Sequence, residues 1–177
     1  FAQNAALPQI TRIEQDVANI TIDGFIDEAV WADLPVIDGM QVIDPDTLED
    51  APYETHIRFF YTERGIYLSA MNFQPKETLM ARMTSRDTRL ERDGFVVAID
   101  ASGEGLYGFL MRINLGNSLT DGTILPERNL NIQWDGPWLA RTQPLENGWS
   151  AEYYIPWSMM ALPQVDDVRK LGFYFER

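Results

Sequence analysis

Two tryptophans four residues apart are the side chains in this sequence most suited to holding a ligand. Trp134 and Trp138 flank a Gly-Pro turn, and rings in such a turn can project from a loop. An aromatic ring offers an apolar face on which the aliphatic face of a sugar can stack. Trp134 also shares parity with Leu130 and Ile132, so the alternative is that it continues a core face. For Trp138 both roles stay open.

Polar side chains that could complete such a site lie on either side of a strongly apolar segment. Arg86, Asp93, Arg112 and Asn114 carry guanidinium, carboxylate and amide groups, which form directional hydrogen bonds to hydroxyls. The sequence therefore predicts a carbohydrate site built from these four residues and the two tryptophans. The alternative is an internal Arg/Asp network that braces the strand beginning at Gly94.

The acidic residues are concentrated in the first third of the chain. Of a net charge of −13, residues 1–60 contribute −10, with 12 acidic and 2 basic residues. This field repels nucleic acid and anionic membrane surfaces, so we exclude both as partners.

One acidic segment has the composition of a cation-binding loop. Asp44, Asp46, Glu49 and Asp50 share a nine-residue segment with two prolines, and carboxylates are the ligands that calcium prefers. The segment lacks the glycine and glutamate spacing of an EF-hand. We therefore keep two interpretations, a calcium site at these four residues and a plain acidic surface loop.

The sequence contains none of the residue patterns that mark the common enzyme classes. It has no cysteine and one histidine, which excludes disulfide scaffolds, thiolate metal sites and cysteine nucleophiles. It also lacks a nucleophile elbow, a phosphate-binding loop and a dinucleotide fingerprint. Asp93 and Asp100 bracket one strand about 23 Å apart, too far to act as a glycosidase pair. We therefore expect a protein without catalytic activity.

Short strands separated by turns dominate the pattern after residue 50. An alternation of apolar and polar residues at about ten-residue spacing predicts an all-β, antiparallel β-sandwich. We expect strands at Thr55–Tyr61, Ile66–Phe73, Gly94–Asp100, Leu106–Leu115, Arg128–Trp134, Trp138–Thr142, Trp149–Ile155 and Leu171–Arg177. Short helices are expected at Ile26–Leu34 and Trp157–Leu162, and Lys76–Met83 fits a helix or a strand.

The order of several motifs resembles a known family. The segment Ile22–Trp31 resembles the opening signature of the family 9 carbohydrate-binding modules and their relatives in the DOMON-like β-sandwich superfamily. Later landmarks follow in the family's order: Ile66–Leu68, Ser85–Asp87, Asp93–Phe95, Phe109–Asn114, Trp134, Trp138, Gly148–Pro156 and Leu171–Arg177. The resemblance implies a jelly-roll-like sandwich, sugar binding by aromatic residues, and structural calcium nearby.

The resemblance also carries expectations about organisation and location. It implies one module over residues 18–177, preceded by an extension over 1–17 and followed by further sequence. Similar modules stand at the amino terminus of large exported bacterial proteins that continue into a domain resembling an outer-membrane barrel. We therefore expect an exported protein, periplasmic, outer-membrane-associated or extracellular, that binds a glycan without catalysis. The alternative is a periplasmic interaction or plug-like domain that serves a following barrel and binds no sugar.

Overall fold

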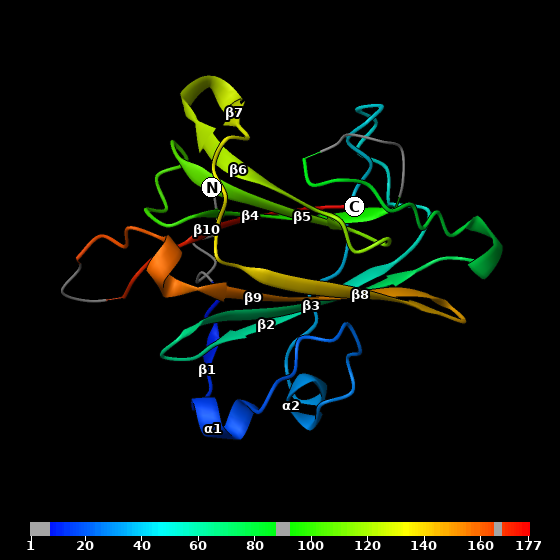
Figure 1. The fold of residues 1–177 in the computed structure, drawn as a ribbon, viewed down its shortest axis with the longest axis horizontal. Helices are drawn as coiled ribbons and strands as arrows, with labels where there is room; N and C mark the ends of the chain where they lie inside the picture. The colour runs from blue at the N-terminus through cyan, green and yellow to red at the C-terminus, as the bar shows by residue number, and fades with distance from the viewer. Residues whose placement is uncertain (1–7, 88–92, 165–167) are drawn as a thin grey trace, which may run out of the picture.

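Within residues 8–87, 93–164 and 168–177, which the computed structural model describes, ten strands form two sheets that lie face to face (Figure 1). The first sheet has the order β1-β2-β3-β9-β8 and the second β10-β4-β5-β6-β7. Their bounds are β1 Thr11–Arg12, β2 Thr55–Tyr61, β3 Gly65–Phe73, β4 Gly94–Asp100, β5 Gly108–Asn114, β6 Leu119–Leu125, β7 Asn129–Asn131, β8 Leu139–Leu145, β9 Gly148–Pro156 and β10 Gly172–Glu176. All neighbouring strands are antiparallel except β1 and β2. The predicted all-β antiparallel sandwich is confirmed.

The main core lies between the two sheets because one parity of most of the long strands is apolar. Phe95 and Met111 of the second sheet and Trp149 and Tyr153 of the first have no exposed surface. Burying each such side chain contributes about 1.5–3 kcal/mol. The hydroxyl of Tyr153 donates a hydrogen bond of 2.6 Å to the carbonyl of Phe95 and so links the two sheets.

A second, smaller core covers one end of the outer face of the first sheet. Helices α1 (Gln15–Ala18) and α2 (Ala29–Ala32) lie below this sheet in Figure 1. Trp31 of α2 packs on Phe60 of β2, with ring centroids 5.3 Å apart, and Phe60 stacks on Tyr67 of β3. The part of the expected extension that the structure describes, from residue 8, includes β1, which pairs with β2.

The helices are shorter than the sequence predicts. The helix expected at Ile26–Leu34 is one turn, α2, and those at Lys76–Met83 and Trp157–Leu162 are 3-10 turns at Lys76–Thr78 and Trp157–Met159. Helices of this length depend on tertiary packing rather than on propensity. Among the described residues no helix is long and apolar enough to cross a membrane.

Strand β6 is not predicted from the sequence, and β7 is shorter than predicted. The inward positions of β6 pair with Met111 and Phe109 but carry Asp121 and Thr123, so no apolar alternation marks the strand. The strand expected at Arg128–Trp134 is limited to Asn129–Asn131. The chain then leaves the second sheet and crosses to β8 of the first, and this crossing holds the two candidate tryptophans.

Candidate functional site

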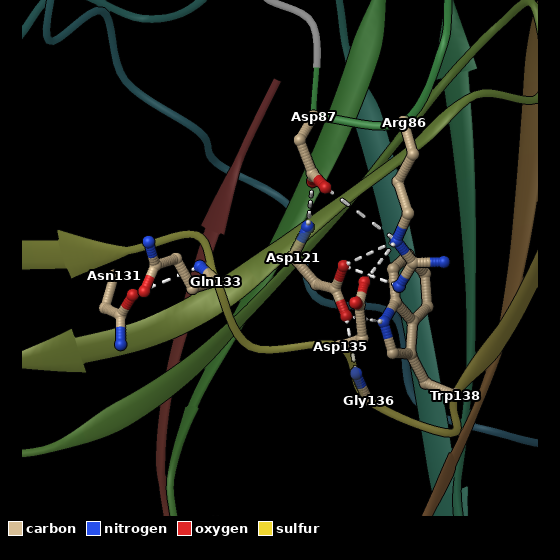
Figure 2. A network of polar contacts seen from close by, with 8 residues as sticks. All are labelled: Arg86, Asp87, Asp121, Asn131, Gln133, Asp135, Gly136 and Trp138. Carbon is tan, nitrogen blue, oxygen red and sulfur yellow. Dashed lines mark hydrogen bonds and ion pairs between the residues drawn. The ribbon is translucent and has the colours of Figure 1, made fainter.

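Three carboxylates and one guanidinium meet where the crossing from β7 to β8 passes the edge of the second sheet (Figure 2). We call Arg86, Asp87, Asp121 and Asp135 the edge cluster. Arg86 Nη2 lies 2.6 Å from Asp121 Oδ1, and Arg86 Nε lies 2.9 Å from Asp135 Oδ1. Asp121 has no exposed surface, whereas Asp135 is exposed. The guanidinium therefore neutralises a buried carboxylate.

The second oxygen of Asp121 fixes the crossing segment. Asp121 Oδ2 accepts hydrogen bonds from the backbone N–H of Gly136 at 2.7 Å and from Trp138 Nε1 at 3.0 Å. The ring of Trp138 is only 3% exposed and lies parallel to that of Tyr153, 5.8 Å away. Trp138 is thus enclosed by the protein, and the expected stacking of a sugar on this ring does not fit the structure.

Trp134 keeps part of its ring at the surface. It is half-buried and packs against Phe109 with ring centroids 5.0 Å apart. A Cβ atom on Gly136 would lie 2.4 Å from the Trp134 ring, so a larger residue at this position would displace the ring. Trp134 is a rim residue of the sandwich, close to the edge cluster.

Asp93 and Asn114 are held by hydrogen bonds within the protein. Asp93 Oδ2 accepts from the backbone N–H of Met80 at 2.6 Å and from Gln74 Nε2 at 3.2 Å. Asn114 is 1% exposed, donates to the carbonyl of Arg82 and accepts from the backbone N–H of Ser118. Both side chains brace the segment between β3 and β4, in line with the alternative interpretation as an internal network.

Arg112 lies elsewhere, on the outer face of the second sheet. Its Nε atom is buried and has no hydrogen-bond partner in the part of the chain that the structure describes. The strand register places Glu176, Val96, Arg112 and Thr120 in one row across four strands. At the usual strand spacing, the Cα atoms of Glu176 and Arg112, two strands apart, are about 10 Å from each other.

The next row of this face contains an exposed aromatic residue opposite an alanine. Tyr174, Ala98, Leu110 and Gly122 lie opposite one another on β10, β4, β5 and β6. Tyr174 is 45% exposed, and its hydroxyl donates to Glu176 Oε2 at 3.0 Å. We call Arg112, Tyr174, Glu176 and Thr120 the outer-face site.

Of the six residues predicted to bind sugar, the edge cluster region brings together Arg86, Trp134 and Trp138. Arg112 and Asn114 share the outward parity of β5, but Asn114 is bound to the backbone of Arg82 and Ser118, so of the six only Arg112 contributes to the outer-face site. Sequence reasoning missed Tyr174, Glu176 and Thr120. The alternation in the last strand could have placed Tyr174 and Glu176 on the outer face. Phe173 and Phe175 point inward, so the residues next to them must point outward.

The four acidic residues proposed for calcium do not converge in the structure. Asp44, Asp46, Glu49 and Asp50 are all exposed. Over the described residues, the three carboxylates whose oxygens lie within 4.8 Å of one another are instead Asp87, Asp121 and Asp135. Their donor chemistry suits a hard cation, but Arg86 already supplies positive charge there.

A buried carboxylate on the other side of the sandwich anchors the motif at residues 22–31. Glu152 of β9 accepts from the backbone N–H groups of Gly24 (2.9 Å) and Asp23 (3.2 Å) and from Trp31 Nε1 (3.2 Å). Burial raises the pKa of Glu152 to about 7; the donor of Gly24 opposes this shift and the charge of Glu28 adds to it. The sequence analysis gave Glu152 no role beyond its place in a motif.

Comparison with known proteins shows similarity at the level of structure. No family model and no curated protein matches the chain. A family 9 carbohydrate-binding module from Caldicellulosiruptor kristjanssonii, solved with cellotriose, superposes with a TM-score of 0.63 at 15% identity, over 94% of this chain and 75% of that one. The glucose complex gives 0.63 at 16% identity, over 93% and 76%.

A third solved structure is similar to this chain over most of its length. It is a provisionally assigned carbohydrate-binding protein from Bacteroides uniformis ATCC 8492, with a TM-score of 0.67, 14% identity, and coverage of 94% of this chain and 80% of that one. The class defined by the two sheets is the β-sandwich. More particularly, the chain has the fold of the family 9 carbohydrate-binding modules, which confirms the fold that the motifs predicted.

Proposed function

We propose that the protein is a carbohydrate-binding module that holds a neutral glycan at the outer-face site. The observation that carries the proposal is the guanidinium of Arg112, whose buried Nε atom has no partner in the described structure. A buried donor without an acceptor is unfavourable. A sugar hydroxyl lying over the face would supply an acceptor for the terminal nitrogens of the same guanidinium.

The other members of the site offer complementary contacts. The exposed ring of Tyr174 provides a stacking surface, and the carboxylate of Glu176, two strands away from Arg112 in the same row, can accept hydrogen bonds. A donor on one side and an acceptor on the other match the hydroxyls of an uncharged sugar ring. Val96 lies between Arg112 and Glu176 in their row, and Ala98 lies beside Tyr174 in the next.

The similar structures support this ligand class, because two of them contain cellotriose or glucose. We propose a binding rather than a catalytic role, since the carboxylates of the edge cluster are engaged by Arg86. We propose in addition that the module is exported, because polymeric glycans are met mainly outside the cytoplasm. Fractionation of the cells that produce the protein tests this last point.

The test is calorimetric titration with cellotriose and glucose, preceded by a broad glycan array. We expect Arg112→Gln and Tyr174→Ala each to weaken glycan binding at least about tenfold, the loss of one good contact. Tyr107→Ala is the matched control, since Tyr107 is 59% exposed but precedes β5.

Three results would count against the proposal. The first is the absence of any glycan ligand on the array, and the second is unchanged affinity in Arg112→Gln. The third is a loss of affinity in Trp134→Ala alone, which would place the glycan site at the edge cluster instead.

A further inference from the structure

A cavity of about 300 Å³ lies over the outer face of the first sheet, on the side of the sandwich opposite to the outer-face site. Its walls are mainly apolar and come from the segment before α2 and from β3 and β8. The apolar lining residues are Phe25, Ile26, Met71 and Leu145. Phe25 is 44% exposed, so one wall is an accessible aromatic ring.

A cationic side chain without a partner contributes to the same cavity. Arg58 of β2 lines it, and Arg58 Nε is buried with no hydrogen-bond acceptor among the described residues. Its cross-strand neighbour Ser69 also has a buried Oγ atom without a partner. A ligand with an anionic oxygen in the cavity would pair with the terminal nitrogens of this guanidinium, whose charge no described acidic side chain balances.

The surrounding charge restricts what that ligand can be. Asp27 is exposed and lines the cavity together with Arg58. Residues 1–60, which include both, carry a net charge of −10. A free anion is therefore repelled as it approaches, whereas a net-neutral ligand with a carboxylate and an ammonium group pairs with both side chains.

The cavity wall is also held in place before any ligand binds. Gly24, next to Phe25, donates its backbone N–H to Glu152 at 2.9 Å, and its carbonyl accepts from Ser150 Oγ at 2.5 Å. Such anchoring lowers the entropic cost of binding.

We propose that this cavity binds a zwitterionic α-amino acid with an apolar side chain. Arg58 pairs with the α-carboxylate, Asp27 with the α-ammonium group, and the side chain lies against Phe25, Met71 and Leu145. This site is independent of the proposed glycan site, because it lies on the other sheet.

The first test uses the unmodified 177-residue chain and three probes, with binding followed by NMR shifts of the backbone amides of residues 25–27. Leucine should bind with saturation. N-acetylleucine, which lacks the ammonium group, and leucinamide, which lacks the carboxylate, should each bind at least about tenfold more weakly. Equal affinity for leucine and either analogue would overturn the proposal, as would no saturable shift with leucine.

The second test uses variants. Arg58→Gln and Phe25→Ala should each weaken leucine binding about tenfold or more. Arg141→Gln is the matched control, because it removes a positive charge from the same face of the sheet at a residue that does not line the cavity. Wild-type affinity in Arg58→Gln would overturn the proposal, and should that variant not fold, the analogue series on the unmodified chain decides. Shifts of the same amides with cellotriose but not with leucine would also overturn it and identify a second glycan subsite.

Discussion

At the scale of single residues, Arg86 supplies the positive charge nearest to the fully buried carboxylate of Asp121. Removing one partner of such a pair leaves an uncompensated charge in a medium of low dielectric. Because Arg86 is itself 39% exposed, solvent screens part of the loss. We expect Arg86→Gln to lower the free energy of unfolding by about 2–3 kcal/mol, measured by urea denaturation.

Arg141→Gln serves as the control. Because Arg141 is exposed, this substitution should lower the free energy of unfolding by less than about 0.5 kcal/mol.

The Arg86→Gln variant also tests whether the edge cluster can bind a cation. Without the guanidinium, Asp87, Asp121 and Asp135 retain three carboxylates within 4.8 Å, so calcium should raise the melting temperature of the variant more than that of the wild type. An equal response of both proteins to calcium would contradict this account of the edge cluster.

Glu152 gives a second residue-scale prediction, on pH. Its pKa is raised from 4.5 to about 7 by burial, so between these values the folded protein binds more protons than the unfolded chain. Stability contributed by this group is therefore present below pH 4.5 and lost as the pH rises through 7. The loss is about 3 kcal/mol, from a shift of roughly 2.5 pKa units at 1.36 kcal/mol each.

The measurement is the free energy of unfolding at pH 5 and pH 8 for the wild type and Glu152→Gln. Acidification also relieves the general repulsion of a chain with charge −13, so only the difference between the two proteins is informative. We expect the wild type to lose more stability than the variant on going from pH 5 to pH 8. Parallel pH profiles would show that Glu152 does not titrate in this interval.

At the scale of elements, the turn into β9 depends on one glycine. Gly148 has φ of +145°, and a Cβ atom there would lie 2.0 Å from the carbonyl oxygen of Asn72 on β3. Gly148→Ala must therefore separate β9 from β3, the central pair of the first sheet. We expect a loss of more than about 3 kcal/mol, the range of strained or overpacked buried sites.

Gly39→Ala separates the two causes of this loss. Gly39 also has positive φ, +74°, but a Cβ atom there would meet nothing within 4 Å. This variant should cost only the backbone strain, about 1 kcal/mol. Similar losses in both variants, measured by thermal unfolding, would mean that the contact with Asn72 relaxes easily.

The sequence predicted most strands because alternation is a direct consequence of a sandwich with one buried face. It missed β6, whose inward positions include Asp121. A buried carboxylate interrupts the apolar alternation by which a strand is predicted, and its burial can be explained only once its partners are known. Trp138 illustrates the same limit. Its role is decided by Asp121 and Tyr153, which are 17 and 15 residues away, and no local pattern connects them.

The roles of the predicted site residues depend on their positions in the fold as well as on their chemical types. The polar residue types chosen from the sequence are chemically suitable, but the fold uses Arg86, Asp93 and Asn114 for internal bonds. Arg112 differs because its buried Nε atom has no partner among the described residues. The partners that complete its site belong to β10 and β6, which are far from β5 in sequence or were not predicted.

At the scale of the whole molecule, the two outer faces differ in what they present. The acidic first third of the chain packs on the first sheet, with Trp31 and Leu34 in the small core there. The second sheet presents the outer-face site, and residues 61–177, which include all of this sheet, carry a net charge of only −3. A sugar bound on the second sheet is thus separated from the titrating carboxylate of Glu152 by the main core.

One chain of contacts connects the outer faces of the two sheets. Tyr153, next to Glu152, donates its hydroxyl to the carbonyl of Phe95, and Phe95 precedes Val96 in the row that holds Arg112. Adjacent side chains on a strand point to opposite faces, and closely packed sheets resist small displacements. A change of charge on Glu152 should therefore alter stability without moving Arg112.

We accordingly expect glycan affinity to vary less than about twofold between pH 6 and pH 8 in the wild type, and Glu152→Gln to bind with wild-type affinity. Calorimetric titration with cellotriose at pH 6, 7 and 8 measures both. If affinity instead followed the titration of Glu152, and this dependence vanished in Glu152→Gln, the two faces would be coupled. Tyr153→Phe, which removes the hydroxyl that links the sheets, would then abolish the dependence as well.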